Sequence, residues 1–156
     1  MSTLQIIFVG LFLLVLVGMV VLTVVVKGKR QAGRDELVDL LGGDDAVLAI
    51  DEKALCQDTA SGEFNEWFGM GSLGIAVDKL VFIRWSPRAT LTIDRADVIG
   101  HTIVTEFRGK DHKKPILQLS FKNPAYDEGE PPGEDEVAWI VEDLEAFDAA
   151  LKEPRG

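Results

Sequence analysis

The chain opens with an uninterrupted run of apolar residues and then changes to short segments in which apolar and polar residues alternate. From Leu4 to Val26 there is no charged residue, and the only polar side chains are one glutamine and one threonine. A helix of this length rises about 34 Å, which is enough to cross a hydrocarbon core of about 30 Å. The pattern predicts one transmembrane helix over residues 4–26, preceded by a short terminus, residues 1–3.

A cleaved signal peptide is the competing interpretation of an apolar run near the N-terminus. Such a peptide needs a positive first segment, a shorter apolar core and small residues at a cleavage site, and none of these features is found here. Basic residues instead follow the run directly, at the predicted membrane-interface positions Lys27, Lys29, Arg30 and Arg34. Because basic residues collect on the cytoplasmic side of a membrane, we expect an uncleaved helix whose C-terminal side faces the cytoplasm.

Residues 27–45 change from basic to acidic and are predicted to form a juxtamembrane linker. Within this linker, residues 35–41 place leucine and valine at near-helical spacing, with acidic residues in the first turn and Gly42 after the last. We therefore expect a short helix here that leans on the domain or on the lipid interface.

Beyond the linker the apolar period becomes two, which is typical of strands that are buried on one face. Leu73, Ile75 and Val77 alternate with small or polar residues, and similar alternation recurs around Leu91 and Leu119. Turn-forming residues separate the segments. The pattern predicts seven strands, near residues 46–56, 72–78, 79–85, 89–94, 101–107, 117–122 and 137–141.

The last element has helical spacing, because three apolar residues fall on one stripe: Leu144, Phe147 and Leu151. Asp143 is a favourable N-cap, and Pro154 stops the helix. A helix over residues 143–152 is therefore expected to plug one open end of an antiparallel barrel or sandwich, with residues 153–156 as a tail. Residues 123–136, before the last strand, are rich in proline and acidic residues and predict a mobile surface loop.

Three segments carry a resemblance to a known family. Residues 71–82 (GSLGIAVDKLVF) read like a Gly-x-Leu, turn, Leu-x-Phe hairpin, and residues 92–99 (TIDRADVI) like a strand followed by an acidic turn and an aliphatic pair. Residues 137–141 lead into the terminal helix. With seven strands and one final helix, the region 46–152 resembles the pleckstrin-homology-like (PH-like) superfold, including its bacterial and GRAM-type branches. The resemblance implies a binding or scaffolding module rather than an enzyme.

The charge of the chain is concentrated after the apolar run. The sequence has 16 basic and 26 acidic residues, and four of the basic residues precede Asp35, so residues 35–156 carry a formal charge of −14. A domain of this sign repels phosphate backbones, which argues against nucleic acid as a partner. With a single cysteine, Cys56, the chain can form no internal disulfide and has no Cys-x-x-Cys motif.

The sequence contains no recognisable nucleophile and base, metal cluster or phosphate cradle, so it predicts no enzyme, cofactor or metal site. His101 and His112 have no acidic or cysteine partners at ligand spacing and are interpreted as ordinary strand and loop histidines. The acidic run 127–136 lacks the spacing of a calcium loop. We interpret it as solvated surface.

Basic residues outnumber acidic ones between Lys79 and Lys122, against the overall balance. They gather at two turns, and six are candidate ligand-binding residues: Arg84, Arg88, Arg108, Lys110, Lys113 and Lys114. Paired basic loops could clamp an anionic headgroup, a phosphate or an acidic peptide. The alternative interpretation is a solvated hairpin without a ligand.

Together these patterns predict a single-pass, membrane-anchored PH-like domain at the cytoplasmic face of a bacterial-type plasma membrane. Its expected role is that of a non-catalytic binding or scaffolding module with a protein partner. An anionic lipid headgroup is a disfavoured ligand, because the domain is strongly acidic. Two alternatives stay open: an extracytoplasmic envelope binding module, and an anionic-lipid sensor that acts through the basic hairpin loops.

Overall fold

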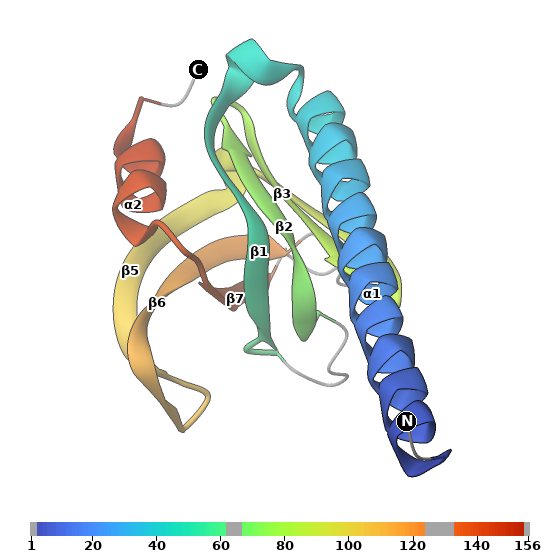
Figure 1. The fold of residues 1–156 in the computed structure, drawn as a ribbon. Coiled ribbons are helices and arrows are strands. Elements are labelled where there is room, and N and C mark those ends of the chain that lie inside the picture. The colour runs from blue at the N-terminus through green and yellow to red at the C-terminus, as the bar shows by residue number, and fades with distance from the viewer. Residues whose placement is uncertain (1–2, 62–66, 124–132, 155–156) are drawn as a thin grey trace. The chain divides into compact units, whose positions relative to one another are not determined.

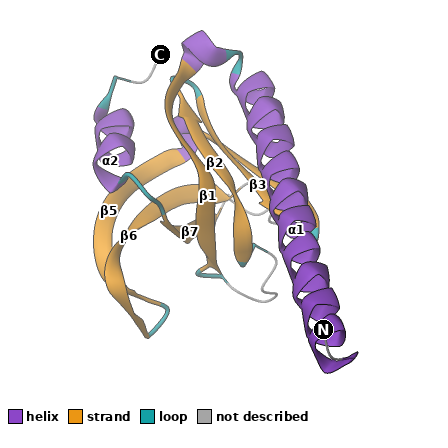
Figure 2. Cartoon of the chain, viewed as in Figure 1, coloured by secondary structure: helices purple, strands orange, loops and turns teal. Residues whose placement is uncertain are grey.

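The computed structural model describes residues 3–61, 67–123 and 133–154 (Figure 1). A long helix comes first, seven strands follow, and a short helix comes last (Figure 2). The helices are α1 (Thr3–Leu41) and α2 (Leu144–Lys152), and two 3-10 helices occupy Asp44–Ala46 and Arg95–Asp97. The strands are β1 (Val47–Thr59), β2 (Gly69–Ala76), β3 (Lys79–Trp85), β4 (Arg88–Asp94), β5 (Val98–Phe107), β6 (Lys110–Asn123) and β7 (Gly133–Ile140). The predicted number and order of strands are confirmed.

The chain divides into two compact units, residues 1–32 and 33–156. The first unit is the apolar part of α1, whose large apolar side chains are exposed from Ile7 to Val26. By length and composition this helix could cross a membrane. The helix predicted over residues 4–26 is therefore confirmed as a helix, and its insertion into a bilayer stays a prediction.

The second unit begins inside α1, which corrects the expected linker. Residues 27–41 continue the first helix rather than forming a linker with a separate short helix. The helix ends at Leu41, where Gly42 and Gly43 adopt φ angles of 100° and 103° that favour glycine. Because Leu37 and Leu41 are buried, the last turns of α1 belong to the domain, and the compact unit starts at Gly33 rather than at residue 46.

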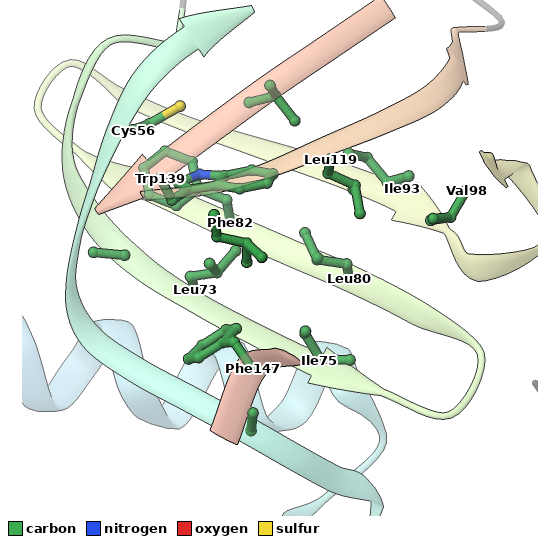
Figure 3. Packing of buried hydrophobic residues seen from close by; sticks show 14 of the residues in the cluster. Cys56, Leu73, Ile75, Leu80, Phe82, Ile93, Val98, Leu119, Trp139 and Phe147 are labelled. Atoms are coloured by element: carbon green, nitrogen blue, oxygen red, sulfur yellow. The ribbon is translucent and has the colours of Figure 1, made fainter. Parts of the chain in front are cut away.

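The strands form one antiparallel sheet in the order β4-β3-β2-β1-β7-β6-β5. Every pair joins consecutive strands except β1 with β7, which brings the first strand beside the last. β3 has the predicted bounds, whereas β1 and β6 extend beyond theirs. Side chains from both halves of the sheet, among them Leu73 of β2 and Leu119 of β6, meet in one core cluster (Figure 3). The sheet therefore folds over onto its own inner face.

The centre of this core is aromatic. Trp139, Phe82 and Phe147 have no exposed surface (Figure 3). The ring centroids of Trp139 and Phe82 lie 6.2 Å apart with the planes tilted by 56°, an arrangement in the favourable range for aromatic pairs. Phe147 belongs to α2, so its burial holds the C-terminal helix on the sheet.

Two polar contacts fix the ends of α2. The Asp143 carboxylate accepts a hydrogen bond from the Ala146 amide at 3.0 Å, which confirms the predicted N-cap. At the other end, the buried Arg95 guanidinium donates to the backbone oxygens of Leu151 and Glu153 at 3.1 and 2.9 Å. A cation at the C-terminus satisfies carbonyls that the helix leaves open and opposes its dipole.

β2 and β3 are buried on both faces, whereas the alternation around Leu73 predicted that β2 is buried on one face only. The outer face of these strands packs against the last turns of α1, where Leu37 and Leu41 join Ala76, Val81 and Ile83 in a second apolar cluster. A Cβ atom on Gly74 would lie 2.5 Å from Cδ1 of Leu41, which is a collision, and 3.2 Å from Cδ2 of Leu37, which is a tight contact. Small residues on β2 therefore make room for a helix rather than marking a solvent-facing side.

Candidate functional site

The hairpin between β5 and β6 carries four of the six candidate residues: Arg108 in its turn, and Lys110, Lys113 and Lys114 on β6. Phe107 pairs with Lys110, so Arg108 and Gly109 form a two-residue turn. Their φ angles are 52° and 72°, and positive φ at both central residues is the type I′ pattern that matches the twist of antiparallel strands. Glycine accepts this backbone readily, whereas arginine adopts it at a cost.

A pocket of about 300 Å³ lies beside this hairpin. Its lining comes from β1, from the residue just before β2, and from the strands and turn of the hairpin: Gln57, Phe68, Phe107, Arg108, Lys110 and His112. Among these described lining residues none is acidic, although the domain as a whole is strongly acidic. The fold therefore collects cationic and aromatic groups beside the β5–β6 hairpin, whose turn lies at the lower end of the sheet in Figure 1.

Arg108, which lines the pocket, forms an ion pair with Asp58. The guanidinium Nη1 lies 3.3 Å from Oδ2 of the carboxylate, whose side chain is 3% exposed. The other carboxylate oxygen accepts a hydrogen bond from the Trp67 amide at 3.1 Å. The two partners are the only non-glycine residues with positive φ in the described part of the chain. Such backbone costs about 1–3 kcal/mol per residue and clusters at functional sites.

Two buried side-chain nitrogens of the lining residues have no hydrogen-bond partner among residues 3–61, 67–123 and 133–154: Nε2 of Gln57 and Nε2 of His112. A buried polar group left without a partner costs about 1–3 kcal/mol. Most buried groups of this kind are satisfied by protein or water. Gln57 and His112 therefore bring two unpaired side-chain nitrogens to the residues that line this pocket.

The other predicted basic turn uses its cations inside the domain. Arg84 is 8% exposed, and its Nε donates to the Pro87 carbonyl oxygen at 2.7 Å. Arg88 forms an ion pair with Glu36 on α1. Lys113 and Lys114 are exposed on β6 and do not line the pocket. Of the six candidates, the structure brings Arg108 and Lys110 together at one pocket.

The predicted membrane-interface residues lie along α1. Lys27 is exposed, and the Lys29 side chain lies outside the described residues. Arg34 is 3.3 Å from Glu52 and 3.7 Å from Asp44. Because Arg34 is paired within the second unit, its charge contributes less to attraction by an anionic surface than the sequence alone implied.

A second pocket, of about 400 Å³, is acidic. It is lined by Ala60, Ser61, Ser120, Glu134, Asp135 and Glu136. Asp135 is 3% exposed and accepts hydrogen bonds from the Ser61 amide and hydroxyl at 3.0 and 2.6 Å. Among the described residues, no three histidine, cysteine or acidic side chains are arranged so that they could hold a metal ion. The acidic run predicted over 127–136 falls mostly on residues 124–132, which lie outside the described part of the chain.

Sequence reasoning missed five contributors to the hairpin pocket: Gln57, Asp58, Phe68, Phe107 and His112. His112 was interpreted as an ordinary loop histidine, and neither Gln57 nor Asp58 carried a distinguishing pattern. Gln57 and His112 belong to β1 and β6, which do not pair with each other. Only the folding of the sheet brings them to one pocket.

Comparisons with known proteins are sparse. No family model and no curated protein matches the chain. A chain of the solved structure "The 8S snRNP Assembly Intermediate" aligns with 68% of this chain and 76% of its own length, at 15% identity and a TM-score of 0.46. A likeness at that level carries no argument about the function of this chain.

Proposed function

We propose that the protein is a membrane-anchored, single-pass PH-like module that faces the cytoplasm and binds or scaffolds a protein partner without catalysing a reaction. The observation that carries the proposal is the exposed apolar surface of α1 from Ile7 to Val26, joined to a compact sheet domain. An apolar surface that large is unfavourable in water and favourable in lipid. Its helical backbone satisfies its own hydrogen bonds, as a bilayer requires.

The strand order supports the PH-like part of the proposal. A seven-stranded antiparallel meander, with its first strand paired to its last and a C-terminal helix packed into the core, is the arrangement that the resemblance implies. The proposed partner is a protein because the acidic domain disfavours nucleic acid and anionic lipid.

The basic residues after the apolar run support the cytoplasmic orientation. Reporter fusions at the C-terminus of the full chain test it. A reporter that is active only in the cytoplasm should be active, and one that is active only outside the membrane should be silent. The reverse pattern would establish the extracytoplasmic alternative.

Carbonate extraction of membranes tests the anchor separately. We expect the chain to stay in the membrane pellet and to begin at or near Met1. Release into the supernatant, or an N-terminus near Lys27, would show that the apolar helix does not anchor the mature protein.

A further inference from the structure

We propose that the hairpin pocket, formed by Gln57, Phe68, Phe107, Arg108, Lys110 and His112, binds a single carboxylate that is flanked by an apolar side chain. This deepens the proposed function by naming the chemistry of the protein partner, and it rests on that function only in taking the partner to be a protein. A C-terminal carboxylate and an acidic side chain next to an apolar residue share this chemistry.

The charge of the lining residues matches one negative charge. The cation of Arg108 is balanced by the buried carboxylate of Asp58. Lys110, which is exposed, adds one positive charge to the lining. A carboxylate carries one negative charge, whereas a phosphate monoester carries about 1.5 to 2. The local balance therefore favours a carboxylate.

The available donors match the acceptor character of a carboxylate. An ionised carboxylate only accepts hydrogen bonds, and it has two oxygens to fill. The Gln57 amide nitrogen can donate only, and the His112 Nε2 can donate in one of its tautomers. Both atoms lack partners in the described part of the chain. Hydrogen bonds to a charged acceptor are stronger than neutral ones. Because both nitrogens are buried, we infer that each side chain rotates slightly to reach a carboxylate bound in the pocket that these residues line.

The aromatic wall accounts for the apolar neighbour. Phe68 is 51% exposed, although it lines the pocket beside polar groups. A pocket of about 300 Å³ is at the small end of ligand sites. It has room for a carboxylate and one adjoining side chain. A ring or aliphatic group laid on Phe68 would remove its exposed surface from water.

Titrations of the full chain in nonionic detergent micelles, followed by the NMR shifts of the His112 ring and the Gln57 side-chain amide, test the proposal. The terminal probe is N-acetyl-phenylalanine, the side-chain probe is N-acetyl-aspartyl-phenylalaninamide, and N-acetyl-phenylalaninamide is the neutral control. Small ligands of this size reach a Kd on the order of 1 mM. At least one carboxylate probe should bind at that level and at least tenfold more tightly than the neutral control. The probe that binds more tightly shows whether the ligand is a C-terminal carboxylate or an acidic side chain.

Two outcomes would overturn the proposal. Equal binding of charged and neutral probes, or no shift at about 20 mM of either carboxylate, would show that the pocket does not recognise a carboxylate. Tighter binding of phenyl phosphate than of both carboxylates would assign the pocket to a dianion. Neither outcome bears on the proposed function, because the reporter fusions and carbonate extraction do not depend on the pocket.

Matched variants test whether the carboxylate probe binds in the hairpin pocket. Lys110→Gln should weaken binding of the carboxylate probe about tenfold, whereas Lys114→Gln, an exposed lysine on the same strand outside the pocket, should leave it unchanged. Gln57→Leu should also weaken binding about tenfold. If Gln57→Leu fails to fold, the exposed lysine pair still decides the matter. Equal effects of both lysine variants would show general charge attraction and contradict a defined site.

Discussion

Cys56 lies on β1 with no exposed surface. Burial raises the pKa of its thiol from 9.0 to about 12, since a thiolate in an apolar surrounding loses its hydration. We expect the folded protein to resist thiol-specific reagents at pH 8 and to react fully once unfolded in denaturant. Rapid labelling of the native chain would contradict the burial of this side chain.

The same pKa difference links stability to pH. Above pH 9.0 the unfolded chain loses the Cys56 proton while the folded chain keeps it, so the folded state holds more protons. The contribution is fully present below pH 9.0 and is lost as pH rises toward about 12. The cysteine should contribute a loss of about 1.4 kcal/mol per pH unit in this interval. Urea unfolding at several pH values, compared with Cys56→Ala, isolates this contribution from other titrating groups.

Trp139 contacts Phe82 at the centre of the core. Trp139→Ala removes the largest fully buried side chain, so it should lower the free energy of unfolding by about 3–5 kcal/mol. Urea unfolding of a chain that begins at Gly33 measures the change. Val77→Ala is the control, because Val77 is 40% exposed, and it should cost less than about 1 kcal/mol. A similar cost for both variants would place Trp139 outside the cooperative core.

At the scale of elements, substitutions in the last turns of α1 test where the domain begins. The sequence predicted a start at residue 46, whereas the compact unit starts at Gly33. Leu37 has no exposed surface and packs on β2 and β3, whereas Leu40 is 41% exposed on the same helix. Leu37→Ala should lower the free energy of unfolding by about 2–4 kcal/mol. Leu40→Ala should cost less than about 1 kcal/mol. If both variants lowered the free energy of unfolding by the same small amount, the last turns of α1 would be a linker and not part of the domain.

β2 shows why the element pattern was informative but incomplete. Its alternation correctly gave a strand, since a period of two follows from the pleated backbone. The pattern could not tell whether small residues at Gly74 and Ala76 faced water or a helix, because both environments accept them. The neighbouring run Leu80–Ile83 is apolar at every position, which is typical of a strand covered on both faces.

At the scale of the whole molecule, the charge asymmetry predicts weak attraction to anionic lipid. Residues 35–156 carry a formal charge of −14, so an anionic surface repels most of the domain. We expect that a chain of residues 33–156 does not sediment with anionic vesicles at physiological salt. Its behaviour should be the same as with neutral vesicles. Salt-sensitive binding in the micromolar range, abolished by Arg108→Glu combined with Lys113→Glu, would instead establish the lipid-sensor alternative.

The sequence by itself determined the apolar helix, the seven strands, the capped terminal helix and the acidic balance. Each of these follows from neighbours close along the chain: side-chain period, cap residues and summed charge. Asp143, for example, caps α2 through an amide three residues away. Local patterns of this kind survive folding because the backbone geometry that creates them is itself local.

Only the tertiary structure decided which charged and polar residues meet. Arg108 pairs with Asp58 across 50 residues, Arg84 and Arg88 are engaged within the domain, and Gln57 and His112 reach one pocket from strands that do not pair with each other. Tertiary contacts also determine where the domain begins, because Leu37 is buried only by packing on the outer face of β2 and β3. Side-chain contacts between distant segments depend on sheet order and curvature, and no local period in the sequence encodes them.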